Sequence, residues 1–226
     1  MERTRKPRAE RYRELVRQRD EGHAAENFEN LGITVADLVG KKTLDIGAGG
    51  GEFARFANER GADVVALSKY LHPTDERRVA ATDTPFVVAD AADLPFQDCS
   101  FDMTVSHASM PNVAGPYRED GESRESHLER VYESMLRVMR EAVRVTKQEG
   151  EVRLAPVIGF EEGAERQTIQ AIAIRRAIDD LNADPELEIL EEALPMAEAV
   201  PEFKRGARHL SRLIIRKRRF PTVLDK

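Results

Sequence analysis

Five short, nearly continuous apolar runs, separated by stretches with helical periodicity, constrain the fold most. They lie at 43–46, 64–67, 85–89, 101–105 and 151–157. Strands that are apolar on both sides are typical of a parallel sheet covered by helices on both faces. Long helical patterns over 127–146 and 164–182 and two C-terminal strands, at 187–190 and 209–216, complete the order β-α-β-α-β-β-α-β-α-β-β. The sequence therefore predicts an α/β, doubly wound, mostly parallel sheet.

Length and composition indicate one domain with an appendage. The chain has 226 residues, of which 41% are hydrophobic and 34% charged. We expect residues 1–40 to be an N-terminal helical arm, with one amphipathic helix over 24–39 closed by Gly40, and 41–226 to be the domain. No apolar run is long enough to span a membrane, and the Arg-rich N-terminus lacks the apolar core of a secretory signal. A single cysteine, Cys99, and widely spaced histidines predict a cytoplasmic chain without a metal site.

The two ends of the chain are basic, and the part between them is acidic. Residues 204–226 hold nine Lys and Arg against one acidic residue, and residues 1–20 hold eight against four. Such ends could bind RNA phosphates, or they could form a solvated face and an edge strand guarded against aggregation. The absence of Trp and of interleaved aromatic residues favours the second interpretation.

A glycine-rich turn follows the first predicted strand and precedes a helical pattern. Its sequence, from Asp45 to Gly51, is D-I-G-A-G-G-G. Glycines let the backbone turn sharply and let a ligand approach it, which predicts a nucleotide-like cofactor at the carboxyl edge of the sheet. Residues 49–54 also fit the dinucleotide pattern G-x-G-x-x-A, and the pair Ser68-Lys69 is compatible with a phosphate-bearing NADP. However, the Tyr-x-x-x-Lys pair of short-chain dehydrogenases does not occur in the chain.

Two strings resemble the class I S-adenosylmethionine-dependent methyltransferases. The turn with Asp45 reads D-x-G-x-G-x-G, which is similar to their motif I, and residues 90–102, D-A-A-D-L-P-F-Q-D-C-S-F-D, resemble the post-motif region of the small-molecule, type 11-like branch. The resemblance implies a Rossmann-like sheet of seven strands with an antiparallel C-terminal strand. It also implies S-adenosylmethionine as the cofactor and methyl transfer by in-line displacement.

The resemblance assigns roles to individual residues. The Asp45 carboxylate would hold the N–H groups of the turn and the ammonium of the cofactor, and Asp90 would accept a hydrogen bond from the adenine amino group. Ser68 stands where the family has an acidic residue for the ribose, so it would be a weaker, neutral acceptor. The remaining cofactor contacts implied are Gly47, Ala48, Gly49, Gly51, the backbone of Ala91, and His107.

The acceptor is expected beyond the fourth strand, where His107 emerges. An imidazole titrates near neutrality and suits a general base, although His107 could instead only contact the cofactor. The loops 112–127 and 158–163 are candidate walls of this site. The Asp/Asn-Pro-Pro-Tyr/Phe string of amino-methyltransferases is missing, which favours a small-molecule acceptor. RNA methylation through the basic ends, and a non-catalytic binding module on the same fold, stay open as alternatives.

Overall fold

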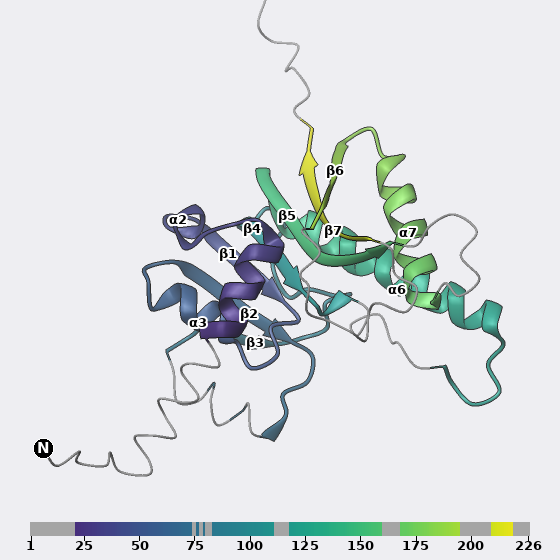
Figure 1. Cartoon of the computed structure of the whole chain (residues 1–226), viewed down its shortest axis with the longest axis horizontal. Coiled ribbons are helices and arrows are strands. Elements are labelled where there is room, and N and C mark those ends of the chain that lie inside the picture. The colour runs from purple at the N-terminus through teal and green to yellow at the C-terminus, as the bar shows by residue number, and fades with distance from the viewer. Residues whose placement is uncertain are drawn as a thin grey trace, which may run out of the picture.

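The computed structural model describes residues 21–73, 76, 79, 83–110, 118–159, 168–194 and 209–218. A helix over residues 21–31, called the N-terminal helix below, precedes the other elements. These are α2 (Val35–Leu38), β1 (Lys42–Ile46), α3 (Glu52–Asn58), β2 (Asp63–Ser68), β3 (Phe86–Val88), β4 (Phe101–His107), α6 (Arg124–Val145), β5 (Thr146–Gly159), α7 (Ile169–Asn182), β6 (Leu187–Ala193) and β7 (His209–Lys217) (Figure 1).

The strands form one seven-stranded sheet in the order β3-β2-β1-β4-β5-β7-β6. β1 to β5 are mutually parallel, whereas β7 runs antiparallel to both of its neighbours. This confirms the doubly wound sheet and the antiparallel C-terminal strand. The chain moves outward from β1 through β2 to β3 and then returns to the other side of β1 with β4. The carboxyl ends of β1 and β4 therefore flank the topological switch point, where open α/β sheets bind their ligands.

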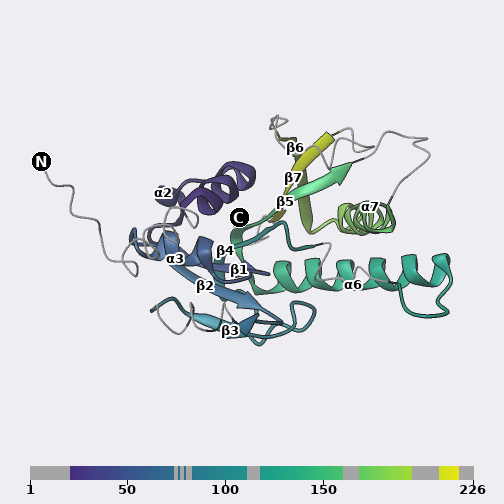
Figure 2. The same ribbon diagram turned by 60° about the horizontal axis from the view of Figure 1, so that its bottom comes forward.

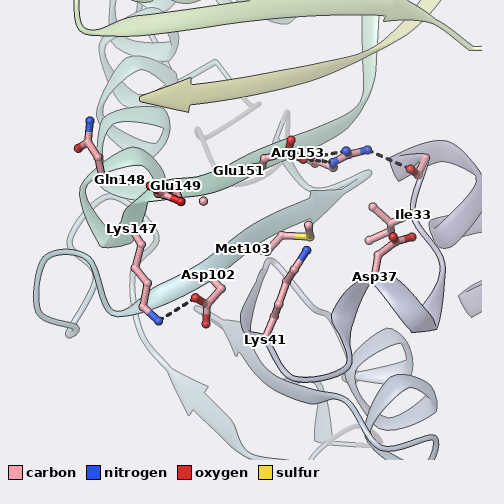
Figure 3. Close-up of a pocket in the computed structure, with 12 residues that line it drawn as sticks. Ile33, Asp37, Lys41, Asp102, Met103, Lys147, Gln148, Glu149, Glu151 and Arg153 are labelled. Atoms are coloured by element: carbon pink, nitrogen blue, oxygen red, sulfur yellow. Dashed lines mark hydrogen bonds and ion pairs between the residues drawn. The ribbon is translucent and has the colours of Figure 1, made fainter. Parts of the chain in front are cut away.

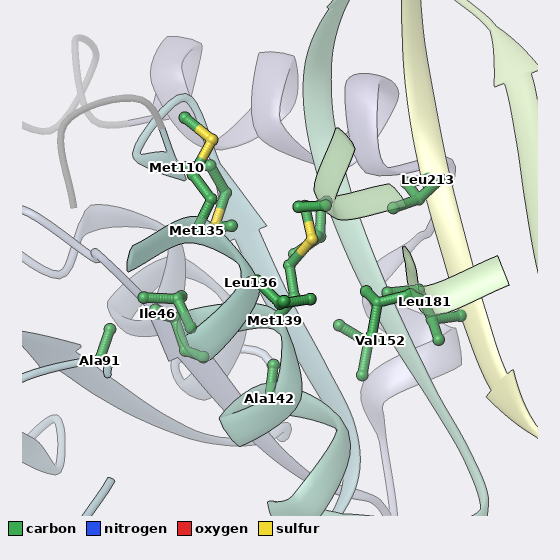
Figure 4. Packing of buried hydrophobic residues seen from close by; sticks show 14 of the residues in the cluster. Ile46, Ala91, Met110, Met135, Leu136, Met139, Ala142, Val152, Leu181 and Leu213 are labelled. Carbon is green, nitrogen blue, oxygen red and sulfur yellow. The ribbon is translucent and has the colours of Figure 1, made fainter. Parts of the chain in front are cut away.

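Each face of the sheet is covered by its own hydrophobic cluster. On one face, Leu44 and Ile46 of β1 belong to a cluster with α6 and α7. Figure 4 labels Ile46, Ala91, Met110, Met135, Leu136, Met139, Ala142, Val152, Leu181 and Leu213 in this cluster. On the other face, Met103 and Val105 of β4 pack with the N-terminal helix and α3. In Figures 1 and 2 the purple N-terminal helix accordingly lies beside α3 and away from α6 and α7.

The predicted single helix over 24–39 is wrong, because the chain breaks it at Gly32. Gly32 has a φ of 64°, its N–H donates to the Glu29 carbonyl over 3.1 Å, and the Ile33 N–H reaches the Phe28 carbonyl over 3.1 Å. These two bonds form a Schellman motif, which ends a helix where glycine adopts the left-handed conformation. The periodic spacing persists across the break because the N-terminal helix and Leu38 of α2 pack into the same cluster.

The other boundaries follow the sequence prediction more closely. β5 is longer than expected and begins directly after α6. The α7 helix begins after Thr168, whose hydroxyl accepts the Ala171 N–H over 3.2 Å, and the predicted start at 164 lies outside the described residues. Within the described part of the chain, no helix is both long and apolar enough to cross a bilayer. The division of the chain at residue 40 stays a prediction.

Candidate active site

The glycine turn leaves β1 through three residues in the left-handed conformation. Gly47, Gly49 and Gly51 have φ values of 74°, 56° and 74°. A Cβ built on Gly49 meets no atom within 4 Å, so the turn opens onto free space at this point. An L side chain there would be strained by about 1–2 kcal/mol and would project into that space.

Two N–H groups of the turn bind to β2, whereas the resemblance implied that Asp45 would hold the N–H groups of the turn. Gly47 and Ala48 donate their N–H groups to the Leu67 carbonyl over 2.8 and 2.9 Å. Both contacts occur because β1 and β2 are paired parallel, with Ile46 level with Leu67. The Asp45 carboxylate is thus left for another partner.

Asp45 is a buried carboxylate at the carboxyl end of β1. The residue is 5% exposed. Burial, with a smaller contribution from the negative charge of Glu52, raises the pKa of Asp45 from its ordinary 3.8 to about 7. Burial disfavours the charged form of a carboxylate, and a nearby cation reverses that preference. The geometry therefore suits a positively charged ligand group beside Asp45.

His107 lies at the carboxyl end of β4, as predicted, and on the same face of the sheet as Asp45. Asp45 is level with Val105, and His107 is the next residue of β4 with the same orientation, because side chains alternate along a strand. The ring is half-buried, and its Nε2 lies 2.9 Å from Nδ2 of Asn30 in the N-terminal helix. Burial lowers the pKa of His107, and the charge of Glu26 opposes this with a smaller effect.

The turn after β4 is fastened to both neighbouring strands, which the sequence did not reveal. Ala108 has a φ of 53°, and its N–H donates to the Ala155 carbonyl of β5 over 2.7 Å. The Ser109 hydroxyl donates to the Ile46 carbonyl at the end of β1 over 3.0 Å. The Ser106 hydroxyl lies 2.6 Å from the Ser109 hydroxyl. A left-handed conformation is costly for a residue other than glycine, so the bonds around Ala108 must hold it in place. The same bonds fix the backbone next to His107.

Beyond β2 and β3, an ion pair joins Lys69 to Asp90, a predicted cofactor residue. The Lys69 ammonium lies 2.7 Å from Oδ2 of Asp90, while Oδ1 of Asp90 accepts the Ala92 N–H over 3.0 Å. The hydrogen bonds from Lys69 and then Ala92 lower the pKa of Asp90. Ser68 donates its hydroxyl to the Tyr70 carbonyl over 3.0 Å. Ala91 is buried, with 3% of its surface exposed.

The segment after Asp90 is anchored by two residues of α6 that sequence reasoning missed. Glu141 accepts the Leu94 N–H over 2.8 Å. The Arg144 guanidinium donates to the Leu94 and Phe96 carbonyls over 3.0 and 2.8 Å. No local pattern marks this pair, because i,i+3 charges are common on any helix surface.

The basic residues of β7 that the structure describes have partners within the protein. Arg212 lies 2.6 Å from Glu192 of β6, and Arg216 lies 2.7 Å from Glu151 of β5. The Lys217 ammonium donates to the Thr146 carbonyl over 2.5 Å. The predicted guarded edge strand is wrong, because β7 lies inside the sheet, where it pairs with β5 on one side and β6 on the other. Residues 1–20, 204–208 and 219–226 lie outside the described residues.

A hollow of about 530 Å³ lies at the opposite edge of the sheet, near the starts of β4 and β5 (Figure 3). Four of its charged side chains form two ion pairs: Lys147 lies 2.7 Å from Asp102, and Arg153 lies 2.7 Å from Glu151. We therefore do not assign the cofactor to this hollow. In the part of the chain that the structure describes, no group of three or more His, Cys, Asp or Glu side chains could hold a metal ion. Of the two predicted loop walls, residues 112–117 and 160–163 lie outside the described residues.

Comparison with known proteins places this site in a family. A family model described as a methyltransferase domain matches residues 44–154, a range that holds the turn, Asp90 and His107. A demethylmenaquinone methyltransferase of Clavibacter sepedonicus is 40% identical over 85 residues, which are 36% of this chain and 35% of that protein. The enzyme of the same name from Paenarthrobacter aurescens is 36% identical over 78 residues, 34% of this chain and 31% of that protein. The match thus spans about a third of the length of these relatives.

Solved structures share the fold at low identity. A chain in complex with the Haloferax volcanii Trm112 methyltransferase activator has a TM-score of 0.55 at 18% identity, over 92% of this chain and 97% of that one. Magnesium protoporphyrin IX methyltransferase from Synechocystis with bound S-adenosylhomocysteine has a TM-score of 0.52 at 12% identity, over 90% and 84%. The [4+2]-cyclase SpnF has a TM-score of 0.52 at 20% identity, over 81% and 78%.

The sheet has the Rossmann-like fold of the class I methyltransferases. Residues 44–154, just under half of the chain, match the methyltransferase-domain family in its type 11 branch. S-adenosylmethionine is the cofactor of this family. The open turn at Gly49 and the buried carboxylate of Asp45 fit that molecule, whose amino-acid end carries an ammonium group.

Proposed function

We propose that this protein binds S-adenosylmethionine over the carboxyl ends of β1, β2 and β3 and transfers its methyl group to a small-molecule acceptor. The observation that carries the proposal is the buried Asp45 carboxylate beside a turn that opens onto free space. An ammonium is the partner that makes an ionised carboxylate favourable in such a place. Gly47, Ala48, Gly49 and Gly51 then provide the backbone that the cofactor approaches.

The adenosine end would lie over β2 and β3. Each oxygen of Asp90 already accepts one hydrogen bond, but a carboxylate oxygen has two lone pairs and can accept a second from the adenine amino group. The backbone of Ala91 would meet the edge of the ring. On the ribose side, Ser68 offers a hydroxyl in place of the usual acid, and the ammonium of the next residue, Lys69, is paired with Asp90.

Catalysis in this arrangement would depend mainly on position. When bound, S-adenosylmethionine supplies a methyl group on a sulfonium, and the displaced thioether is neutral. The bond from sulfur to the methyl carbon breaks with its electron pair left on sulfur, as the acceptor atom forms a new bond to that carbon. The protein contributes mainly by orienting the two reactants. His107, at the switch point and on the Asp45 face, is the residue that we place next to the acceptor.

A small acceptor is favoured over RNA by the ion pairs of β7. Arg212 and Arg216 are paired with acidic residues of neighbouring strands, so their charges are not displayed as a free basic surface. The relatives named demethylmenaquinone methyltransferase suggest an aromatic quinol as the first acceptor to test, although the shared segment covers only about a third of each chain.

The test is a transfer assay with S-adenosylmethionine carrying a tritiated methyl group. The full chain is incubated separately with a short-chain 2-prenyl-1,4-naphthoquinol, a set of small phenols and amines, and total RNA. We expect label in the small-molecule extract and none when Asp45→Ala replaces the wild type. Label confined to RNA would overturn the small-molecule assignment. No label in any fraction, with cofactor bound, would identify a binding module.

A further inference from the structure

The N-terminal helix contributes a side chain to the candidate active site. Asn30 lies 77 residues before His107, and its Nδ2 is 2.9 Å from Nε2 of the imidazole. The amide nitrogen of asparagine carries only donor hydrogens, so in this contact Nε2 accepts. An imidazole whose Nε2 accepts carries its single ring proton on Nδ1.

The place of Asn30 is fixed by packing that does not involve His107. Phe28 and Leu31 are buried in the same cluster as α3, and the rings of Phe28 and Phe53 lie 4.7 Å apart. Arg153 of β5 donates to the Leu31 carbonyl over 3.1 Å and to the Gly32 carbonyl over 2.9 Å, at the end of the helix. Asn30 therefore sits on a rigid support and can orient the imidazole.

Charged groups around His107 lie on three elements. Glu26 is one turn before Asn30 in the N-terminal helix, and its charge reaches the imidazole. On the neighbouring strands, Asp45 of β1 and Arg153 of β5 are both level with Val105 of β4. Burial outweighs Glu26 and lowers the pKa of His107, which keeps the ring uncharged near neutral pH.

We propose that Asn30 is a positioning residue that holds His107 as the Nδ1–H tautomer, so that His107 meets the acceptor as a hydrogen-bond donor and the N-terminal helix forms one wall of the acceptor site. With Nε2 occupied, the ring has no free lone pair with which to take a proton. The acceptor class that fits has an oxygen within reach of Nδ1–H, either a carbonyl or an ionised phenol or enol. This inference rests on the proposed function, and it replaces the general-base role predicted from sequence.

The tautomer can be read directly by NMR. The full chain, labelled with ¹⁵N at its five histidines, gives long-range ¹⁵N–¹H imidazole spectra in which His107→Gln identifies the signals of His107. We expect the wild type to show the Nδ1–H pattern and a midpoint below the ordinary 6.5. Asn30→Asp should raise that midpoint by about one pH unit or more, because a carboxylate stabilises the protonated ring. Asn30→Ala should admit the Nε2–H tautomer.

The matched control is Ala25→Asp, which adds the same charge at an exposed position of the same helix. An Nε2–H pattern in the wild type, or equal midpoints in Asn30→Asp and Ala25→Asp, would overturn the proposal. The transfer assay separates the two claims. The expected spectra without any methyl transfer would refute the proposed function and leave the positioning role intact. Methyl transfer with unaltered Asn30→Asp spectra would refute the positioning role alone.

Discussion

Replacing Asp45 with Asn should make the free protein more stable at high pH while weakening its hold on the cofactor. The carboxylate is buried at the end of β1, and its pKa is raised from 3.8 to about 7. Between these values the unfolded chain ionises at Asp45 while the folded chain keeps the proton. Stability therefore falls as the pH rises through this window and stays low above it. Asn cannot ionise, so the variant escapes this loss.

The magnitude follows from the width of the window. A difference of about 3 pH units at 1.36 kcal/mol per unit gives a loss of at most about 4 kcal/mol above pH 7. The part of this window that lies between pH 5 and pH 8 runs from pH 5 to about 7, which is about 2 pH units. The advantage of Asp45→Asn should therefore grow by about 3 kcal/mol between these two pH values. Any constant cost of the buried amide cancels in this comparison.

Urea unfolding at pH 5 and pH 8 measures the change for wild type and variant. Asp102→Asn is the control with the opposite sign, because Lys147 holds the pKa of Asp102 below its ordinary value. That variant should be less stable than wild type by a similar amount at pH 8 and pH 5, because both values lie above the ordinary 3.8 of Asp102, and the difference should shrink only at lower pH. An Asp45→Asn advantage that is the same at both pH values would refute the reasoning that burial destabilises the ionised carboxylate.

Three further predictions concern the surroundings of the site. Asp90→Asn should weaken S-adenosylmethionine binding about tenfold by calorimetry, because the charged acceptor of the adenine hydrogen bond is lost. The control, Asp93→Asn at an exposed position, should not weaken binding, and equal affinities of the two variants would contradict the adenine assignment. Arg144→Met should lower the free energy of unfolding, measured in urea, by about 1.5–3 kcal/mol, because its bonds to the segment after Asp90 are lost. Arg140→Met, at an exposed position of α6, should lower it by less than about 0.5 kcal/mol, and similar values for the two variants would contradict the anchoring of that segment. Arg216→Gln should leave filter retention of RNA unchanged, because its charge is already paired, and a marked loss would revive the RNA alternative.

The sheet and the glycine turn could be predicted because their signals are local. A buried parallel strand is a short apolar run, and the turn at Gly47, Gly49 and Gly51 needs residues that tolerate positive φ. The helix break at Gly32 was missed because the apolar spacing continues through it. The spacing of apolar residues shows only which side of a helix is buried. Two successive helices that pack against the same cluster can therefore keep one continuous spacing across the break.

The partners of the site residues could not be predicted, since they arise from tertiary contacts. Asn30 reaches His107 only because the N-terminal helix packs against β4. The Lys69–Asp90 pair depends on β2 lying beside β3. Nothing in the neighbouring sequence of either residue specifies these contacts. The predicted roles of the site residues in binding and catalysis stay predictions.

Calorimetric titration of the full chain with S-adenosylmethionine tests the central claim most directly, if wild type is compared with Gly49→Val and Gly61→Val. Both glycines have positive φ and open space at the Cβ position, so both variants carry similar backbone strain. Only Gly49 faces the proposed site. We predict that wild type and Gly61→Val bind with the same Kd and that Gly49→Val gives no heat at millimolar cofactor. Wild-type affinity in Gly49→Val, or no binding by the wild type, would contradict the account.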